Sequence, residues 1–173
     1  LKKLNITPKH ISLYEQAFTH PSYNADANTK HHDYERLEFL GDSVIDLAVA
    51  EISFVTRPDL NQGSLTKMRA ALVSTGGLSF LARKYGLHEY IRLGNSFSGD
   101  IARANHILEN VFEAFIGALY LDQGFKVTKD VLVNIFIDSI KTFNAEALND
   151  YKSRLQEEMQ AEHRESVSYE VVS

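Results

Sequence analysis

The hydrophobic and polar positions of this chain follow a period of about 3.6 residues along most of its length, which is typical of amphipathic helices. Segments rich in Gly, Pro, Asn and Ser separate these stretches. Helices are expected near residues 7–18, 33–54, 64–85, 103–122 and 128–142. Gly76-Gly77 should interrupt the third helix, Gly124 should cap the fourth, and residues 89–93 should be extended. The pattern predicts an all-α domain over residues 1–145.

The pattern changes towards the C-terminus. Residues 150–163 are typical of a short charged helix, and residues 166–172 alternate with the period of two that marks a strand. A single strand needs partners, and the sequence offers none nearby. We therefore interpret residues 150–173 as the truncated start of a second, α+β domain, joined to the first by a linker at residues 146–149.

The helix expected over residues 33–54 gathers its acidic side chains on one face. At about 100° per residue, Glu35, Glu38 and Asp42 lie within an arc of about 60°, opposite an apolar face. Like charges at this spacing cost a few tenths of a kcal/mol per pair, and a hard divalent cation would offset that cost. A solvated acidic surface is the simpler interpretation of such a face.

Two further residues of this helix favour a functional surface. Phe39 lies on the acidic side, away from the leucine face, which indicates a second contact surface. Gly41 costs about 1 kcal/mol inside a helix, so a close approach of another segment is expected there.

The helix expected over residues 103–122 supplies the second half of a possible site. Asn110 and Glu113 are neighbours on one face, next to small residues that include Gly117. If the two helices cross at Gly41 and Gly117, four oxygen-bearing side chains come together. These are Glu38, Asp42, Asn110 and Glu113. Such a set suits Mg²⁺ or Mn²⁺, whereas the alternative leaves Asn110 and Glu113 as ordinary surface residues.

Composition limits the remaining possibilities. The 173 residues contain no cysteine, which excludes disulfides and thiolate metal sites and favours the cytoplasm. No apolar run is long enough to cross a membrane, so no membrane partner is expected. The net charge of −5 argues weakly against a nucleic-acid partner, but bound cations would neutralise an acidic cluster locally.

Four segments resemble, in order and spacing, the motifs of the ribonuclease III family. They are residues 17–23 (AFTHPSY), 35–43 (ERLEFLGDS), 63–70 (GSLTKMRA) and 112–122 (FEAFIGALYLD). The resemblance covers about residues 5–145. Residues 150–157 are similar to the start of the family's double-stranded-RNA-binding domain, and the layout is similar to that of the simple bacterial enzymes.

The resemblance implies an all-α endonuclease domain that works as a homodimer, with one active site per subunit. It would cleave double-stranded RNA by phosphodiester hydrolysis assisted by Mg²⁺, for which Mn²⁺ can substitute, in the processing and maturation of ribosomal and messenger RNA. The residues that match the family's functional positions are Glu38, Asp42, Asn110 and Glu113 as metal ligands, Asp42 and Glu113 as catalytic residues, Glu35 and Gln62 as RNA contacts, and Phe39 at the dimer interface.

Two positions depart from the family pattern. Asn110 stands where Asp is usual, and Gln62 stands where Glu is usual. Asparagine keeps one oxygen donor but loses the charge, so cation affinity should fall. An alternative is therefore a catalytically impaired double-stranded-RNA-binding protein of the same fold. A third interpretation, a purely structural helical protein, predicts no divalent-ion binding.

Overall fold

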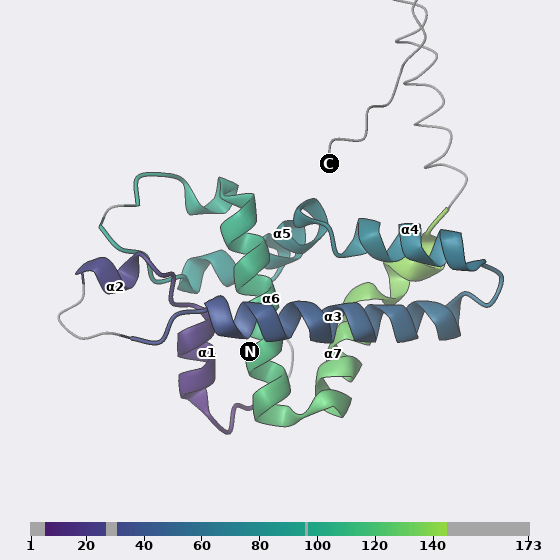
Figure 1. The fold of residues 1–173 in the computed structure, drawn as a ribbon, viewed down its shortest axis with the longest axis horizontal. Coiled ribbons are helices and arrows are strands. Elements are labelled where there is room, and N and C mark those ends of the chain that lie inside the picture. Colours follow the sequence, from purple (N-terminus) through teal and green to yellow (C-terminus); the bar gives the residue numbers. More distant parts are fainter. Residues whose placement is uncertain (1–5, 27–30, 96, 145–173) are drawn as a thin grey trace, which may run out of the picture. The chain divides into compact units, whose positions relative to one another are not determined.

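The computed structural model describes residues 6–26, 31–95 and 97–144, and these form packed helices (Figure 1). The α-helices are α1 (Ile11–Ala17), α2 (Tyr23–Asp26), α3 (Glu35–Thr56), α4 (Gln62–Leu72), α5 (Thr75–Lys84), α6 (Asn105–Gln123) and α7 (Phe125–Thr142). Short 3-10 helices are η2 (Leu87–Tyr90) and η3 (Ile101–Arg103). The predicted all-α fold is confirmed. The predicted linker and second domain lie outside the described residues.

Helix α6 forms the centre of the described domain, packed against α1, α3 and α5. It is apolar around most of its circumference, as expected of a helix with neighbours on several sides. Its fully buried side chains include Leu108, Val111, Phe112, Phe115, Ile116 and Leu119. In the described part of the chain, no helix combines the length and apolar character that a membrane span requires.

Helices α3 and α6 cross with their backbones in contact (Figure 1). A Cβ atom added to Gly41 would overlap the carbonyl oxygen of Glu113 and would lie 3.0 Å from the nitrogen of Gly117. A Cβ atom added to Gly117 would overlap the carbonyl oxygen of Leu37. The predicted crossing at Gly41 and Gly117 is therefore confirmed, and only glycine fits at either position.

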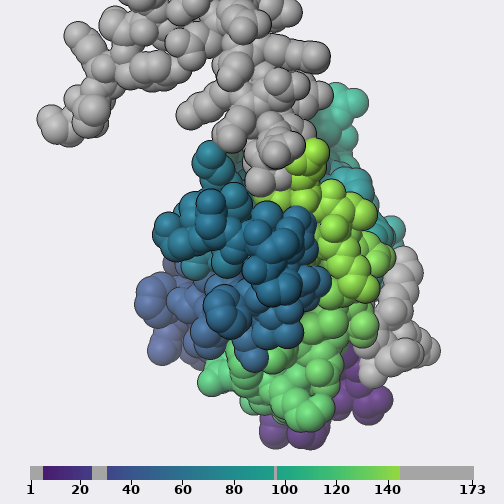
Figure 2. Space-filling view, turned by 90° about the vertical axis from the view of Figure 1, so that its right-hand side faces the viewer, coloured from purple at the N-terminus to yellow at the C-terminus, as the bar shows by residue number. Residues whose placement is uncertain are grey.

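Helix α7 lies beside the segment where α3 ends and α4 begins, as Figure 2 shows. Arg57, which follows α3, donates a hydrogen bond to the carbonyl oxygen of Ile140 (3.1 Å), and Lys129 forms an ion pair with Glu51 of α3.

Helix α7 begins at Phe125, three residues before the predicted start. Gly124 ends α6 with a φ of 84° and is the whole connection between the two helices, so its predicted capping role is confirmed.

Helix α1 begins later than predicted because the preceding residues bind Asp122 at the end of α6. The buried Asp122 carboxylate accepts hydrogen bonds from the backbone N–H groups of Lys9 (3.1 Å) and His10 (2.7 Å) and from the Tyr14 hydroxyl (2.9 Å). The Thr7 carbonyl, which a helix starting there would use in its first turn, instead accepts from the side chain of Gln123. The helix therefore starts at Ile11.

The glycine pair does not separate α4 from α5, contrary to the prediction. The break lies at Val73 and Ser74, and the Ser74 hydroxyl caps α5 by accepting from the Gly77 N–H (3.2 Å). A Cβ atom on Gly77 would lie 2.5 Å from the Leu72 carbonyl oxygen, so this glycine permits close packing between the two helices.

The predicted extended piece at residues 89–93 is wrong for its first half, because η2 continues to Tyr90. Its second half contributes Arg92, which forms an isolated parallel bridge with Thr19. Among the described residues this bridge is the one strand-like pairing.

Replacing Gly41 with alanine should destabilise the domain by about 3 kcal/mol, because the new methyl group meets helix backbone that cannot move aside. Urea unfolding of Gly41→Ala against the unaltered chain measures the loss. Gly76→Ala is the matched control, since its Cβ atom would lie 4.0 Å from its nearest neighbour and should change stability by less than about 0.5 kcal/mol. Equal stability of the two variants would contradict the close crossing.

The Asp122 contacts predict a specific loss of stability in acid. Burial raises the pKa of Asp122, but hydrogen bonds from the backbone of Lys9 and His10 and the side chains of Gln123 and Tyr14 outweigh it and hold the pKa at about 2. An unfolded aspartate has a pKa of 3.8. The stabilisation is therefore complete above about pH 4 and is lost as the pH falls towards 2.

Asp122→Asn should lose about 1–2 kcal/mol at pH 7, because buried donors lose their charged acceptor. It should also show a shallower stability decline between pH 4 and pH 2. Urea titrations across that range test both points, with Asp130→Asn, an exposed α7 residue paired with Lys126, as the control. A variant whose pH profile parallels that of the control would refute this role of Asp122.

Candidate active site and metal centre

The crossing of α3 and α6 positions the predicted ligands. Glu38 and Asp42 flank Gly41 on α3, while Asn110 and Glu113 lie on α6 within two turns of Gly117. Each side chain is thus carried by a rigid helix close to the point where the two backbones touch.

Glu113 experiences the combined charge of the cluster. Burial raises its pKa to about 8, and the charges of Asp42, Glu109, Glu38 and Asp46 act in the same direction. A bound cation would have the opposite effect, because positive charge favours the ionised carboxylate. Glu113 therefore has the electrostatic character of a ligand whose counter-charge is supplied from outside the protein.

Glu38 shares this environment. Half-burial raises its pKa, and the charges of Glu35, Glu109 and Asp42 raise it further. Glu35 is exposed at the first position of α3, and Asp42 is exposed one turn beyond Glu38. The cluster thus runs from the half-buried Glu113 outward to carboxylates that face solvent.

The donor chemistry of these side chains fits a hard divalent cation. All four predicted ligands offer oxygen, which Mg²⁺ and Mn²⁺ prefer. Within the described ranges, no three acidic, histidine or cysteine side chains already lie at metal-binding spacing. Mutual repulsion favours such a separation, and the ligand roles of Glu38, Asp42, Asn110 and Glu113 remain predictions.

Glu109 belongs to the cluster, although the sequence analysis did not single it out. It is half-buried, pairs with His106 (3.4 Å) and contributes negative charge to both Glu38 and Glu113. Its position four residues before Glu113 was the available signal, because residues four apart share a helix face.

Tyr34 is a second site residue that sequence reasoning missed. Only 4% of it is exposed, and the charges of the acidic cluster act on its hydroxyl. Burial raises the pKa of Tyr34 to about 12, the neighbouring Asn110 side chain lowers it, and the charges of Glu38, Glu35 and Asp33 raise it.

The structure does not bring Gln62 to the acidic cluster. Gln62 is the exposed first residue of α4, and its side-chain nitrogen donates to the Thr66 hydroxyl (3.3 Å). Arg69 lies two turns after Gln62, about 10 Å further along α4. Its guanidinium pairs with the Asp46 carboxylate of α3 at 3.8 Å, so Asp46 is bound to a basic side chain. The RNA contacts assigned to Gln62 and Glu35 remain predictions.

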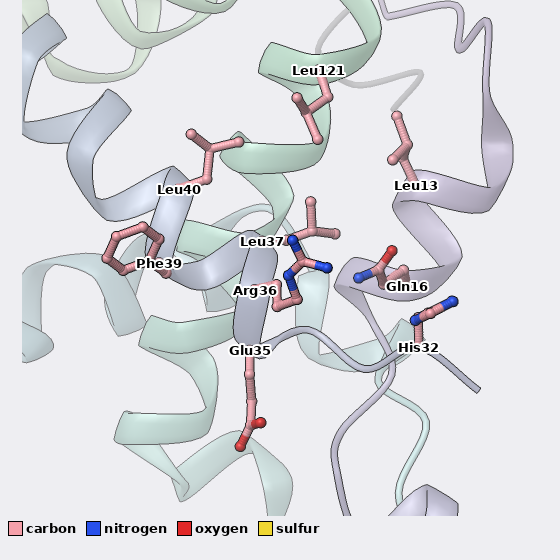
Figure 3. A pocket seen from close by; sticks show the side chains of 9 residues that line it. All are labelled: Leu13, Gln16, His32, Glu35, Arg36, Leu37, Phe39, Leu40 and Leu121. Atoms are coloured by element: carbon pink, nitrogen blue, oxygen red, sulfur yellow. The ribbon is translucent and has the colours of Figure 1, made fainter. Parts of the chain in front are cut away.

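Phe39 is 79% exposed and borders an apolar groove of about 790 Å³. Leu13 and Gln16 of α1, Leu37 and Leu40 of α3 and Leu121 of α6 are among the residues that line the groove. Figure 3 shows that Phe39 projects from α3 away from the side chains of α1. The dimer-interface role assigned to Phe39 remains a prediction.

The family model described as Ribonuclease-III-like matches residues 10–140. Ribonuclease 3 of Leuconostoc mesenteroides subsp. mesenteroides is 42% identical over 98% of this chain and 73% of the relative. The solved nuclease domain of ribonuclease III from Campylobacter jejuni has a TM-score of 0.72 and 31% identity over 83% of this chain and 95% of that one.

A second structure of the Campylobacter jejuni nuclease domain is described by its flexibility in a region involved in dimer formation. It has a TM-score of 0.70 and 33% identity, and the match covers 77% of this chain and 90% of that one. The family model, the relative that matches nearly all of this chain and the shared fold agree. The chain therefore belongs to the ribonuclease III family and is an endoribonuclease of the hydrolase class.

Proposed function

We propose that this chain cleaves double-stranded RNA by phosphodiester hydrolysis, with Glu38, Asp42, Asn110 and Glu113 holding a divalent cation. The observation that carries the proposal is the carboxylate cluster at the α3–α6 crossing, in which Glu113 has a pKa of about 8. When bound, Mg²⁺ or Mn²⁺ lowers the pKa of water and stabilises charge on phosphate oxygens.

The residues of the cluster differ in burial, and we assign their roles accordingly. The half-buried Glu113 fixes the inner side of the site, and the exposed Asp42 faces the solvent from which substrate arrives. Both are the proposed catalytic residues. Asn110 contributes an uncharged oxygen, which weakens cation binding but also limits repulsion in a cluster that already raises the pKa values of Glu38 and Glu113.

RNA recognition in this proposal depends on the shape of the duplex. A-form RNA presents 2′-hydroxyls and phosphates across a wide minor groove, so sequence specificity is not expected. Glu35 and Gln62, both exposed, are the proposed RNA contacts. The bacterial origin of relatives named Ribonuclease 3 supports a role in ribosomal and messenger RNA processing in the cytoplasm.

We propose a homodimer assembled along α3. Phe39, Leu47 and Phe54 are 79%, 59% and 71% exposed and project from the same side of the helix. In a twofold dimer the same surface is used by both subunits, so each Phe39 can enter the groove that the other subunit presents beside its own. The dimer formation described for the Campylobacter jejuni domain supports a homodimer.

Cleavage of a long RNA duplex in Mg²⁺ tests the proposed activity. The unaltered chain should cut, and Glu113→Ala should reduce the rate at least about 100-fold because an inner ligand is lost. Asn110→Asp should lower the Mg²⁺ concentration needed for half-maximal rate. Asp130→Ala, which removes an exposed carboxylate on α7, is the control.

Cleavage by Asn110→Asp together with inactivity of the unaltered chain would favour the impaired RNA-binding alternative, which Asn110 and Gln62 motivate. Absence of divalent-ion binding by both proteins would favour the purely structural alternative.

Replacing Phe39 with alanine should weaken dimerisation by about 3 kcal/mol if its ring is buried between subunits. Sedimentation equilibrium across a concentration series measures the change in dissociation constant. Phe80→Ala, which removes a 59% exposed ring on α5, is the matched control and should leave the constant unchanged. An unaltered chain that stays monomeric at every concentration would refute the dimer.

A further inference from the structure

The acidic cluster at the α3–α6 crossing repels the substrate that the proposed function assigns to it. Every nucleotide of an RNA strand carries a negative phosphate, and the carboxylates of Glu35 and Asp42 are exposed. A bound cation neutralises only part of this charge. A protein that brings RNA to such a site therefore needs fixed positive charge at its border.

Two basic side chains pair with acids at the border of the cluster. His106 of α6 lies 3.4 Å from Glu109, and Arg69 of α4 lies 3.8 Å from Asp46 of α3. A histidine is charged only when it is protonated, whereas an arginine is always charged. Of the two, Arg69 is therefore the side chain that carries permanent positive charge.

Asp46 holds Arg69 close to the predicted metal ligands. It follows Asp42 by about one helical turn, or about 6 Å along α3, and its charge contributes to the raised pKa of Glu113. Helix α4 packs against α3 and so brings Arg69 to this level of the helix (Figure 1). The guanidinium thus lies about one turn beyond the carboxylates proposed to bind the cation.

The pair with Asp46 leaves Arg69 able to bind a second group. A guanidinium has five N–H donors in a planar fork that matches phosphate oxygens, and a separation of 3.8 Å is too long for a hydrogen bond. The side chains of Arg69 and Asp46 are 40% and 41% exposed. An exposed pair of this length contributes little to stability, so stability alone does not explain it.

Arg69 also lies on the same face of α4 as Gln62. Gln62, Thr66 and Arg69 are spaced by four and three residues, which places them within an arc of about 60°. Gln62 and Thr66 are exposed, and their side chains are joined by a hydrogen bond of 3.3 Å. This polar face begins at a proposed RNA contact and reaches the border of the acidic cluster about 10 Å further along α4.

We propose that Arg69 binds a backbone phosphate of double-stranded RNA beside the cleavage site, and that Asp46 holds the guanidinium in place before RNA arrives. The inference rests on the proposed function, because it takes the acidic cluster as the place where RNA is cut. It adds a fixed cation to a surface whose other proposed RNA contacts, Glu35 and Gln62, carry no positive charge.

The salt dependence of RNA binding tests this contact. Arg69→Gln should lower the slope of log affinity against log salt concentration by about one, and should weaken binding in about 0.1 M KCl about three- to tenfold, because one phosphate contact is lost. Arg69→Lys should keep the slope, since a lysine also neutralises a phosphate. Fluorescence anisotropy of a labelled RNA duplex in EDTA, which withholds the metal, measures the affinities.

Lys126→Gln is the matched control, since it removes an exposed, ion-paired cation of α7 and should leave the slope unchanged. An unchanged slope in folded Arg69→Gln would assign Arg69 a structural role and overturn the inference. An unaltered chain that binds no duplex RNA would overturn both the inference and the proposed function. RNA binding that depends on Arg69, without cleavage in Mg²⁺, would support the phosphate contact and refute the proposed cleavage.

Nuclear magnetic resonance of the unaltered chain provides a test that does not depend on the folding of a variant. The Arg69 Nε–H signal should shift when a short RNA duplex is added. The Arg57 Nε–H signal is the internal control and should not shift, because that group donates to the Asp59 carboxylate (2.9 Å). An Arg69 signal that stays in place at saturating RNA would overturn the inference.

Discussion

The close crossing of α3 and α6 is the constraint on which the rest of the structure depends. At Gly41 and Gly117 the two backbones touch, so neither helix can rotate or slide without a clash with main-chain atoms. Side-chain packing alone allows small adjustments, but backbone contact does not. The crossing therefore fixes both the central core around α6 and the positions of Glu38, Asp42, Asn110 and Glu113.

This geometry brings carboxylates together at an electrostatic cost, and that cost indicates a functional site. Carboxylates on two helices are held near each other and partly out of water, which raises the pKa values of Glu38 and Glu113. A domain selected for stability alone would gain by replacing them. The arrangement is reasonable when a cation supplies the missing charge, which is also why perturbed acids often mark functional sites.

The sequence predicted those features for which a residue type at a given position has a single physical explanation. Glycine inside a helix indicated a close approach, and the helical period placed the acids on one face. It failed where the cause lies far away in the sequence. The start of α1 depends on Asp122, which lies more than 100 residues further along the chain, so neither local propensity nor periodicity reveals this contact.

The same distance along the chain has a consequence for the order of folding. Lys9 and Asp122 are 113 residues apart, so their contact closes one of the longest loops possible in this domain. The entropy lost on closing this loop is offset by contacts between α1 and α6, and these contacts need an α6 that already packs against another helix. We infer that α1 docks late, and that Asp122 closes a domain whose central helix pair has already formed.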